Sequence, residues 1–109
     1  MSVGEATFRA AVLESELPVL VHFWAPWCGL CKMITPVLQS FQNEWKDHVR
    51  LIDINADENL RLANTYRLSN LPTLLLFDHG KDDLRLALDA FMRNRELIYD
   101  IPRLVRIYP

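Results

Sequence analysis

The chain has 109 residues, of which 24% are charged, and a formal net charge of −2, a composition typical of one soluble globular domain over residues 1–109. The balanced charge argues against nucleic acid as a partner, because no basic stripe dominates the sequence. No run approaches the roughly 18 apolar residues of a membrane span, and residues 1–18 lack the layout of a signal peptide, so we expect a cytoplasmic protein without a membrane partner.

Hydrophobic periodicity predicts helices that alternate with strands along the chain. The run over 19–25 is almost wholly apolar, which is typical of a strand buried on both faces of a sheet. In chain order the predicted elements are a helix over 6–15, a strand over 19–25, a helix over 31–45, a strand over 48–56, a helix over 58–68 with Asp57 as its N-cap, a strand over 72–80, an antiparallel strand over 84–90 and a helix over 93–108. This order predicts an α/β fold with a central mixed four-stranded sheet and helices on both faces.

The two cysteines of the chain, Cys28 and Cys31, are separated by two residues at the start of a predicted helix. Backbone N–H groups and the helix dipole stabilise a thiolate on the first cysteine, and the second is one turn further, within reach of a disulfide. This spacing predicts that Cys28 attacks a target disulfide and that Cys31 resolves the mixed disulfide. Gly29 leaves the approach to Cys28 open, and Trp27 offers a flat apolar surface to a protein substrate.

Other uses of the cysteine pair fit the sequence less well. Structural zinc takes four ligands, but there is no second pair of this kind, and His22, His48 and His79 come from three separate segments. Covalent haem attachment requires a histidine after the second cysteine, where this chain has Lys32. Two inert core cysteines remain the structural alternative. We therefore expect neither a metal nor a bound organic cofactor, since two sulfurs suffice to carry the electrons.

Three stretches resemble the thioredoxin family, and the likeness runs from about Phe8 to Ala90. "FWAPWCGLCKMITPVL" resembles the active-site strand, turn and kinked helix, "DINADEN" the following strand and turn, and "NLPTLLLF" the segment that carries a cis-proline opposite the cysteines. The resemblance implies a thioredoxin-like fold with a redox-active Cys28–Cys31 disulfide. It also implies a cis peptide bond before Pro72, which leaves the backbone of Leu71 free to pair with an extended substrate.

The sequence departs from typical thioredoxins at positions that face the substrate. Leu30 stands where the family usually has proline and restores a backbone N–H, so we expect a shifted redox potential. Asp89 places a carboxylate where a glycine usually lies, which should alter the choice of partner. Only residues 1–3 stand where the family has a full edge strand, so we expect that strand to be absent. The sheet should then have four strands, or five if a short edge strand forms there.

A second departure concerns the interior of the sheet. His22 stands where typical thioredoxins bury an aspartate, and Asp53 stands where they have its lysine partner, so we expect these two side chains to interact. His22 then acts either as a neutral base for Cys31 or as a charged group that favours thiolates. The third alternative is a core hydrogen bond without a functional role.

The resemblance implies an enzyme, a protein-disulfide reductase of electron transport and cell redox homeostasis. Its expected partners are disulfide-containing proteins as substrates and an electron donor of the thioredoxin-reductase type. One alternative is a binding module that holds an extended peptide beside Pro72, with a redox site detuned by His22 and Asp89. Another is a thiol oxidant or isomerase. No heptad seam or surplus apolar surface is visible in the sequence, so we expect a monomer.

Overall fold

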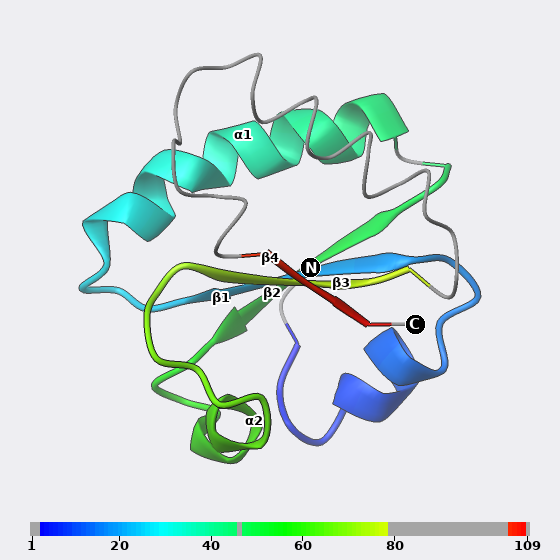
Figure 1. Ribbon diagram of the computed structural model, residues 1–109. Coiled ribbons are helices and arrows are strands. Elements are labelled where there is room, and N and C mark those ends of the chain that lie inside the picture. The colour runs from blue at the N-terminus through cyan, green and yellow to red at the C-terminus, as the bar shows by residue number, and fades with distance from the viewer. Residues whose placement is uncertain (1–2, 46, 79–104, 109) are drawn as a thin grey trace.

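The computed structural model describes residues 3–45, 47–78 and 105–108. In chain order the elements are the short π-helix η1 (Arg9–Leu13), β1 (Val19–Trp24), α1 (Gly29–Trp45), β2 (Arg50–Asn55), α2 (Leu60–Thr65), β3 (Thr73–Phe77) and β4 (Val105–Tyr108). Figure 1 shows α1 on one side of the sheet, with η1 and α2 on the other. Helices therefore cover both faces, as the alternating pattern predicts. Within the described ranges, no helix combines the length and the apolar character that crossing a bilayer demands.

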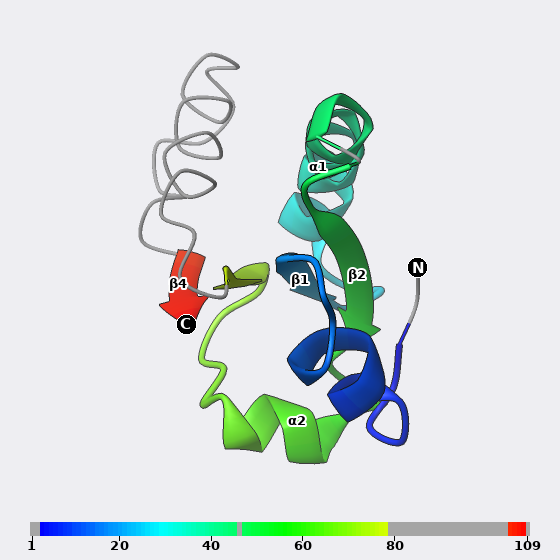
Figure 2. The ribbon, with the colours of Figure 1, turned by 90° about the vertical axis from the view of Figure 1, so that its right-hand side faces the viewer.

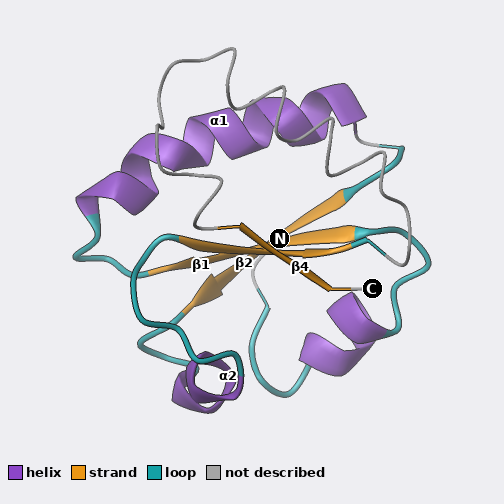
Figure 3. Ribbon diagram, in the orientation of Figure 1, coloured by secondary structure: helices purple, strands orange, loops and turns teal. Residues whose placement is uncertain are grey.

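The sheet is mixed, and β1 lies at its centre. The strand order is β2-β1-β3-β4, with β1 parallel to β2 and antiparallel to β3, and the strands are coloured together in Figure 3. The register places His22 of β1 beside Asp53 of β2 and Leu74 of β3. Because β1 and β2 are parallel, their carboxyl ends meet at one edge of the sheet, where the loops after them can approach each other.

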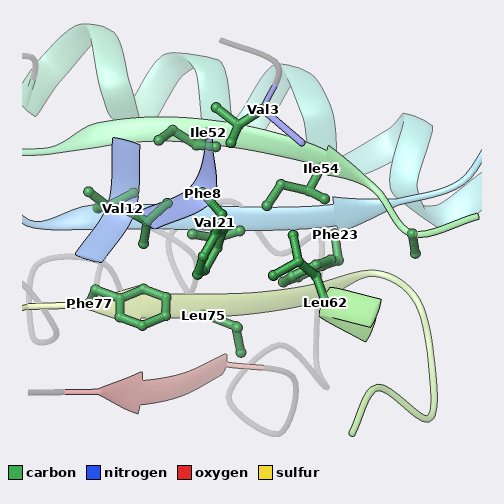
Figure 4. Close-up of a cluster of buried hydrophobic side chains, with 12 residues drawn as sticks. Val3, Phe8, Val12, Val21, Phe23, Ile52, Ile54, Leu62, Leu75 and Phe77 are labelled. Atoms are coloured by element: carbon green, nitrogen blue, oxygen red, sulfur yellow. The ribbon is translucent and has the colours of Figure 1, made fainter. Parts of the chain in front are cut away.

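Side chains of β1 alternate between two cores. On one face Val21 packs with Val12 of η1 and Leu62 of α2 in a cluster that Figure 4 shows in close-up. On the other face Leu20 packs with Ile34 of α1. Both faces of the strand are thus buried, which explains why its sequence is apolar at nearly every position.

The C-terminal strand differs from the sequence-based expectation. Val105–Tyr108 pairs parallel to β3, whereas the helix predicted over 93–108 included these residues, and for them that prediction is wrong. Three of the four residues of β4 are β-branched or aromatic, and such residues favour a strand. The strand predicted over 84–90 and the remaining part of the predicted helix lie outside the described residues. The prediction that residues 84–90 form the fourth strand is therefore not confirmed. The candidate site is built on the mixed sheet of β2, β1 and β3.

No strand precedes β1 in the part of the chain described from Val3 onward. Instead, the backbone N–H of Val3 donates to the carbonyl oxygen of Asp53 at 3.1 Å, and the Val3 side chain is buried in the cluster of Figure 4. The chain therefore touches the outer edge of β2 at this residue before it turns into η1. Figure 2 shows this N-terminal segment beside β2.

Candidate active site around Cys28 and Cys31

Cys28 and Cys31 form a disulfide at the start of α1, with their Cα atoms 5.3 Å apart. Cys28 directly precedes the helix, and the backbone N–H of Cys31 donates to Cys28 Sγ at 3.1 Å. The Cys28 sulfur therefore occupies the place of an N-cap acceptor. After reduction, the same N–H and the helix dipole would stabilise a thiolate there. Both cysteines are buried, with exposed fractions of 5% and 2%.

The surface above the disulfide is open and apolar. A Cβ built on Gly29 would meet no atom within 4 Å from the described residues outside its chain neighbours and its own helix backbone, so none of those residues crowds the approach there. Trp27 is 70% exposed, and Leu30 and Met33 are 44% and 61% exposed. We call Trp27, Leu30 and Met33 the apolar rim of the site. Met33 was absent from the residues expected at the site, although its helical spacing of three from Leu30 places the two on one face.

Trp27 is held by Asp57, a residue that the sequence pattern had placed at the start of a helix. The indole Nε1–H of Trp27 donates to Asp57 Oδ2 at 2.9 Å. The prediction that Asp57 caps the following helix is wrong, because α2 begins at Leu60 and its flanking residue is Asn59. Asn55 Oδ1 accepts the backbone N–H of Asp57 at 2.9 Å, which fixes the turn. β1 and β2 are parallel, so the loops that follow them, which carry Trp27 and Asp57, leave the sheet at the same end. This predicted topology could have indicated that the two residues lie near each other.

The segment before β3 reaches the disulfide from the other side. The Leu71–Pro72 peptide bond is cis, as the family resemblance implies. Leu71 packs against the cluster of Ala25, Cys28 and Cys31, so the residue before the proline lies beside the two sulfurs. Asp89, the remaining residue expected on this surface, lies outside the described residues.

His22 and Asp53 lie next to each other behind the disulfide. His22 Nδ1 is 3.2 Å from Asp53 Oδ1; the His22 side chain is 2% exposed and that of Asp53 is 32% exposed. A pocket of about 340 Å³ opens beside them, lined by His22, Trp24, Cys31, Lys32, Thr35 and Asp53. The two expected partners are thus brought together at a pocket that also reaches Cys31.

Lys32 and Thr35 were not among the expected site residues. Thr35 Oγ1–H donates to the carbonyl oxygen of Cys31 at 2.8 Å. Thr35 follows Cys31 by four residues, which places the two on one face of the helix, and this spacing was a usable signal. Within the described ranges, no three His, Cys, Asp or Glu side chains gather as metal ligands.

Comparison with known proteins gives a consistent result. The family model described as Thioredoxin matches residues 1–98. The chain is 45% identical over 80 residues to Thioredoxin 1 of Synechococcus elongatus, covering 73% of this chain and 75% of that protein. It is 42% identical over 88 residues to a thioredoxin of Rickettsia felis, covering 80% and 84%. It is also 44% identical over 80 residues to the chloroplastic M-type thioredoxin of Chlamydomonas reinhardtii, covering 73% and 57%.

Proposed function

The chain belongs to the thioredoxin family, and from this premise we propose that it reduces protein disulfides by a dithiol–disulfide cycle at Cys28 and Cys31. Family membership together with the cysteine pair makes it a thiol–disulfide oxidoreductase, an enzyme of the protein-disulfide reductase class. The observation that carries the proposal is the Cys28–Cys31 disulfide at the N-terminal end of α1, with the Cys31 N–H directed at Cys28 Sγ.

Cys28 performs the first half of the cycle. Its thiolate, stabilised by the end of the helix, attacks one sulfur of the target disulfide. A mixed disulfide forms between Cys28 and the target, and the other target sulfur leaves as a thiolate that takes a proton from solvent. The open space above Gly29 supports this attack, because the target sulfur must approach Cys28 in line with the bond that breaks.

Cys31 performs the second half. Its thiolate attacks Cys28 Sγ, the mixed disulfide breaks, and the target leaves with both of its sulfurs reduced. Two electrons have then passed from the protein to the target, and the Cys28–Cys31 disulfide remains. The sulfurs carry these electrons themselves, so the cycle needs no metal or organic cofactor. An electron donor of the thioredoxin-reductase type restores the dithiol.

The apolar rim and the cis-proline segment would hold the substrate. Trp27, Leu30 and Met33 expose apolar surface next to the sulfurs, and Leu71 lies against them from the other side. An extended segment of the target could pair with the backbone of Leu71 while its disulfide meets Cys28. Asp89, which lies outside the described residues, is proposed from the sequence to modify partner choice. A cytoplasmic location and a monomeric state stay predictions from the sequence.

Reduction of insulin disulfides with dithiothreitol as electron donor tests the proposed function. We expect the wild-type chain to accelerate precipitation of the insulin B chain and a Cys28→Ser variant to be inactive. A Cys31→Ser variant should accumulate a mixed disulfide with the target, which non-reducing electrophoresis detects. Wild-type rates equal to those of Cys28→Ser would contradict the reductase and favour the peptide-binding module. A strongly oxidising reduction potential, measured against a glutathione redox buffer, would favour the oxidant or isomerase instead.

A further inference from the structure

The chain leaves α2 through a left-handed turn at Arg67, whose φ is 52°. The backbone N–H of Arg67 donates to the carbonyl oxygen of Asn64 at 3.1 Å, and that of Leu68 donates to the carbonyl oxygen of Ala63 at 3.0 Å. This pair of bonds is the Schellman arrangement that ends many helices. It satisfies carbonyl groups inside α2, but it supplies no donor to the carbonyl oxygens of Tyr66 and Arg67, which need partners from elsewhere.

One guanidinium group from β4 binds both of these carbonyl oxygens. Arg106 Nη1 donates to the carbonyl oxygen of Tyr66, and Nη2 donates to that of Arg67 at 3.1 Å. The planar fork of an arginine suits two acceptors that lie next to each other, and hydrogen bonds from a charged donor are stronger than neutral ones. Neither of the two ion pairs found among the described residues involves Arg106, so no carboxylate among them competes for the guanidinium. We call this contact the Arg106 clamp.

Tyr108 fastens β4 to the same place. It follows Arg106 by two residues in a strand, so both side chains point to one face. The Tyr108 ring packs edge-on against the ring of Tyr66, with 5.6 Å between the ring centroids. Figure 2 shows β4 at the edge of the sheet, next to β3, to which the chain returns from α2. Arg106 lies beyond residue 98, where the match with the family model ends, so the family likeness does not account for the clamp.

The segment after the clamp leads directly to the disulfide. Residues 68–72 form neither helix nor strand, and Leu71 packs against the cluster that contains both cysteines. At the far end of the segment, Thr73 Oγ1–H donates to the carbonyl oxygen of Asn70 at 2.5 Å. The segment is therefore held at its start by Arg106 and at its end by Thr73. Holding both ends reduces the number of conformations that it can sample.

We propose that Arg106 is a positioning residue for the binding of protein substrates. By binding the two carbonyl oxygens after α2, it holds residues 68–71 in the conformation in which Leu71 lies beside the disulfide and meets an extended substrate. The inference rests on the proposed function and deepens it, because it concerns only the docking of the target. The chemistry of the sulfurs should not depend on the clamp, since the donor to Cys28 Sγ is the N–H of Cys31 in α1.

Arg106→Met is the most direct variant, because it keeps an unbranched side chain and removes every donor. Without the clamp, only a fraction of the molecules hold the segment ready for a substrate, and the apparent affinity falls by that fraction. We expect KM for insulin to rise about tenfold, which corresponds to about 1.4 kcal/mol, with an unchanged kcat, as for a loss of binding alone. Initial rates over a range of insulin concentrations, with dithiothreitol as electron donor, measure both constants.

Two further measurements separate docking from chemistry and from charge. The rate at which the reduced protein attacks the small disulfide dithiobis-nitrobenzoate should be the same in Arg106→Met and the wild-type protein, because that reaction needs no extended substrate. Arg61→Met is the matched control, since it removes the same charge from an α2 side chain that is 90% exposed and lies 3.9 Å from Glu5. Such a surface pair contributes little to stability, so KM should stay at the wild-type value.

Arg106→Lys tests the two-carbonyl geometry. Its ammonium group keeps the charge but lacks the planar fork, so it serves one carbonyl oxygen well and the other poorly. We expect KM for insulin to rise about threefold, which is half of the free-energy effect of Arg106→Met.

Hydrogen exchange observes the segment without any substrate. The N–H of Leu68 is bonded within the turn that the clamp holds, so its exchange reports local opening there. We expect this amide to exchange about tenfold faster in Arg106→Met, while the amides of α1 exchange as in the wild-type protein.

Each outcome supports the clamp or overturns it. A wild-type KM in folded Arg106→Met overturns the proposal and leaves the reductase intact, and a wild-type KM in Arg106→Lys overturns the two-carbonyl geometry. An equal rise of KM in Arg61→Met assigns the effect to charge, and faster exchange throughout the chain assigns it to a general loss of stability. Both results also overturn the clamp. A wild-type protein that reduces neither insulin nor dithiobis-nitrobenzoate counts against the proposed function itself. If Arg106→Met does not fold, KM and Leu68 exchange in Arg106→Lys decide the question.

Discussion

The hydrogen bond from Trp27 to Asp57 turns an exposed side chain into a fixed part of the site. Trp27 is 70% exposed, and without the bond at 2.9 Å its ring would sample several rotamers in solvent. Ordering a side chain when a partner binds costs roughly 0.5–1.5 kcal/mol. The bond removes part of this cost before the substrate arrives.

Asp57→Ala should therefore weaken the binding of a protein substrate more than it slows the thiol–disulfide exchange step. We expect KM for insulin to rise about fivefold, equivalent to about 1 kcal/mol. The rate at which the reduced protein attacks the small disulfide dithiobis-nitrobenzoate should stay unchanged, because that reaction does not depend on docking of a protein substrate. Glu58→Ala is the matched control, since its exposed side chain neighbours Asp57 in the same turn. An equal rise in KM for both variants would show that the turn, and not the Trp27 bond, is responsible.

Leu30 adds one backbone donor near Cys28 that a proline would lack. It is the second residue of α1, and the second and third N–H groups of a helix are those that hydrogen-bond an N-cap acceptor. Leu30→Pro should destabilise the Cys28 thiolate by about 1.5 kcal/mol, as for a hydrogen bond to a charged group, and make the reduction potential about 30 mV more negative.

Leu30→Ala separates the donor from the side chain, because it keeps the N–H and removes most of the apolar surface. Its reduction potential, measured in a glutathione redox buffer, should match that of the wild-type protein. A shift of similar size in Leu30→Ala and Leu30→Pro would assign the effect to the lost leucine side chain.

Among the elements, the central strands and α1 were predictable from the sequence, and the C-terminal strand was not. The continuous apolar runs of β1 and β3 and the helical spacing of apolar residues in α1 are visible in the sequence. The prediction for Val105–Tyr108 failed because a strand of four residues depends on pairing with β3 for its stability, and this pairing outweighs the helical spacing of the longer segment 93–108. Asp57 was misassigned for a similar reason, since its capping propensity is local and its contact with Trp27 is not.

The packing of Tyr108 of β4 against Tyr66, which directly follows α2, should make stability sensitive to alkaline pH. The pKa of Tyr66 is raised above its ordinary value, chiefly by burial and also by the neighbouring Tyr108. Because the unfolded chain ionises this phenol at a lower pH than the folded one, the free energy of unfolding should fall as pH rises above about 10.

Tyr66→Phe removes the ionisable group and keeps the ring that contacts Phe8 and Phe77. We expect thermal unfolding midpoints of the wild-type protein to drop more steeply between about pH 9 and about pH 11 than those of Tyr66→Phe. Parallel curves for the two proteins would show that burial of this phenol does not contribute to the alkaline loss.

On the scale of the whole molecule, the sheet separates one of the two apolar clusters from the redox chemistry. The face covered by η1 and α2 carries one cluster (Figure 4), while the face covered by α1 carries the other cluster and the pocket beside Cys31. Spacing and family likeness gave Cys28, Cys31, Pro72 and the His22–Asp53 pairing. The pocket beside His22 and Cys31 could not be predicted in this way, because its lining comes from segments that only the folded sheet and helix bring together.

Phe8→Ala tests this separation. Phe8 is 4% exposed and lies in the cluster away from the disulfide, so its truncation should lower the free energy of unfolding by about 3–5 kcal/mol in urea denaturation. Phe8→Leu should lower it by less than about 1.5 kcal/mol. The reduction potential of both variants, measured where they are fully folded, should equal the wild-type value, and a shift in either would mean that the two faces are coupled.

Asp53 serves two neighbours at once. Its carboxylate receives the ring hydrogen of His22, and its main-chain oxygen receives the amide hydrogen of Val3. A displacement of Val3, for example by a segment fused ahead of it, would therefore act on the backbone of the same residue whose carboxylate contacts the His22 ring. Changes at the start of the described chain would in this way be transmitted to the pocket that His22 and Asp53 line together with Cys31.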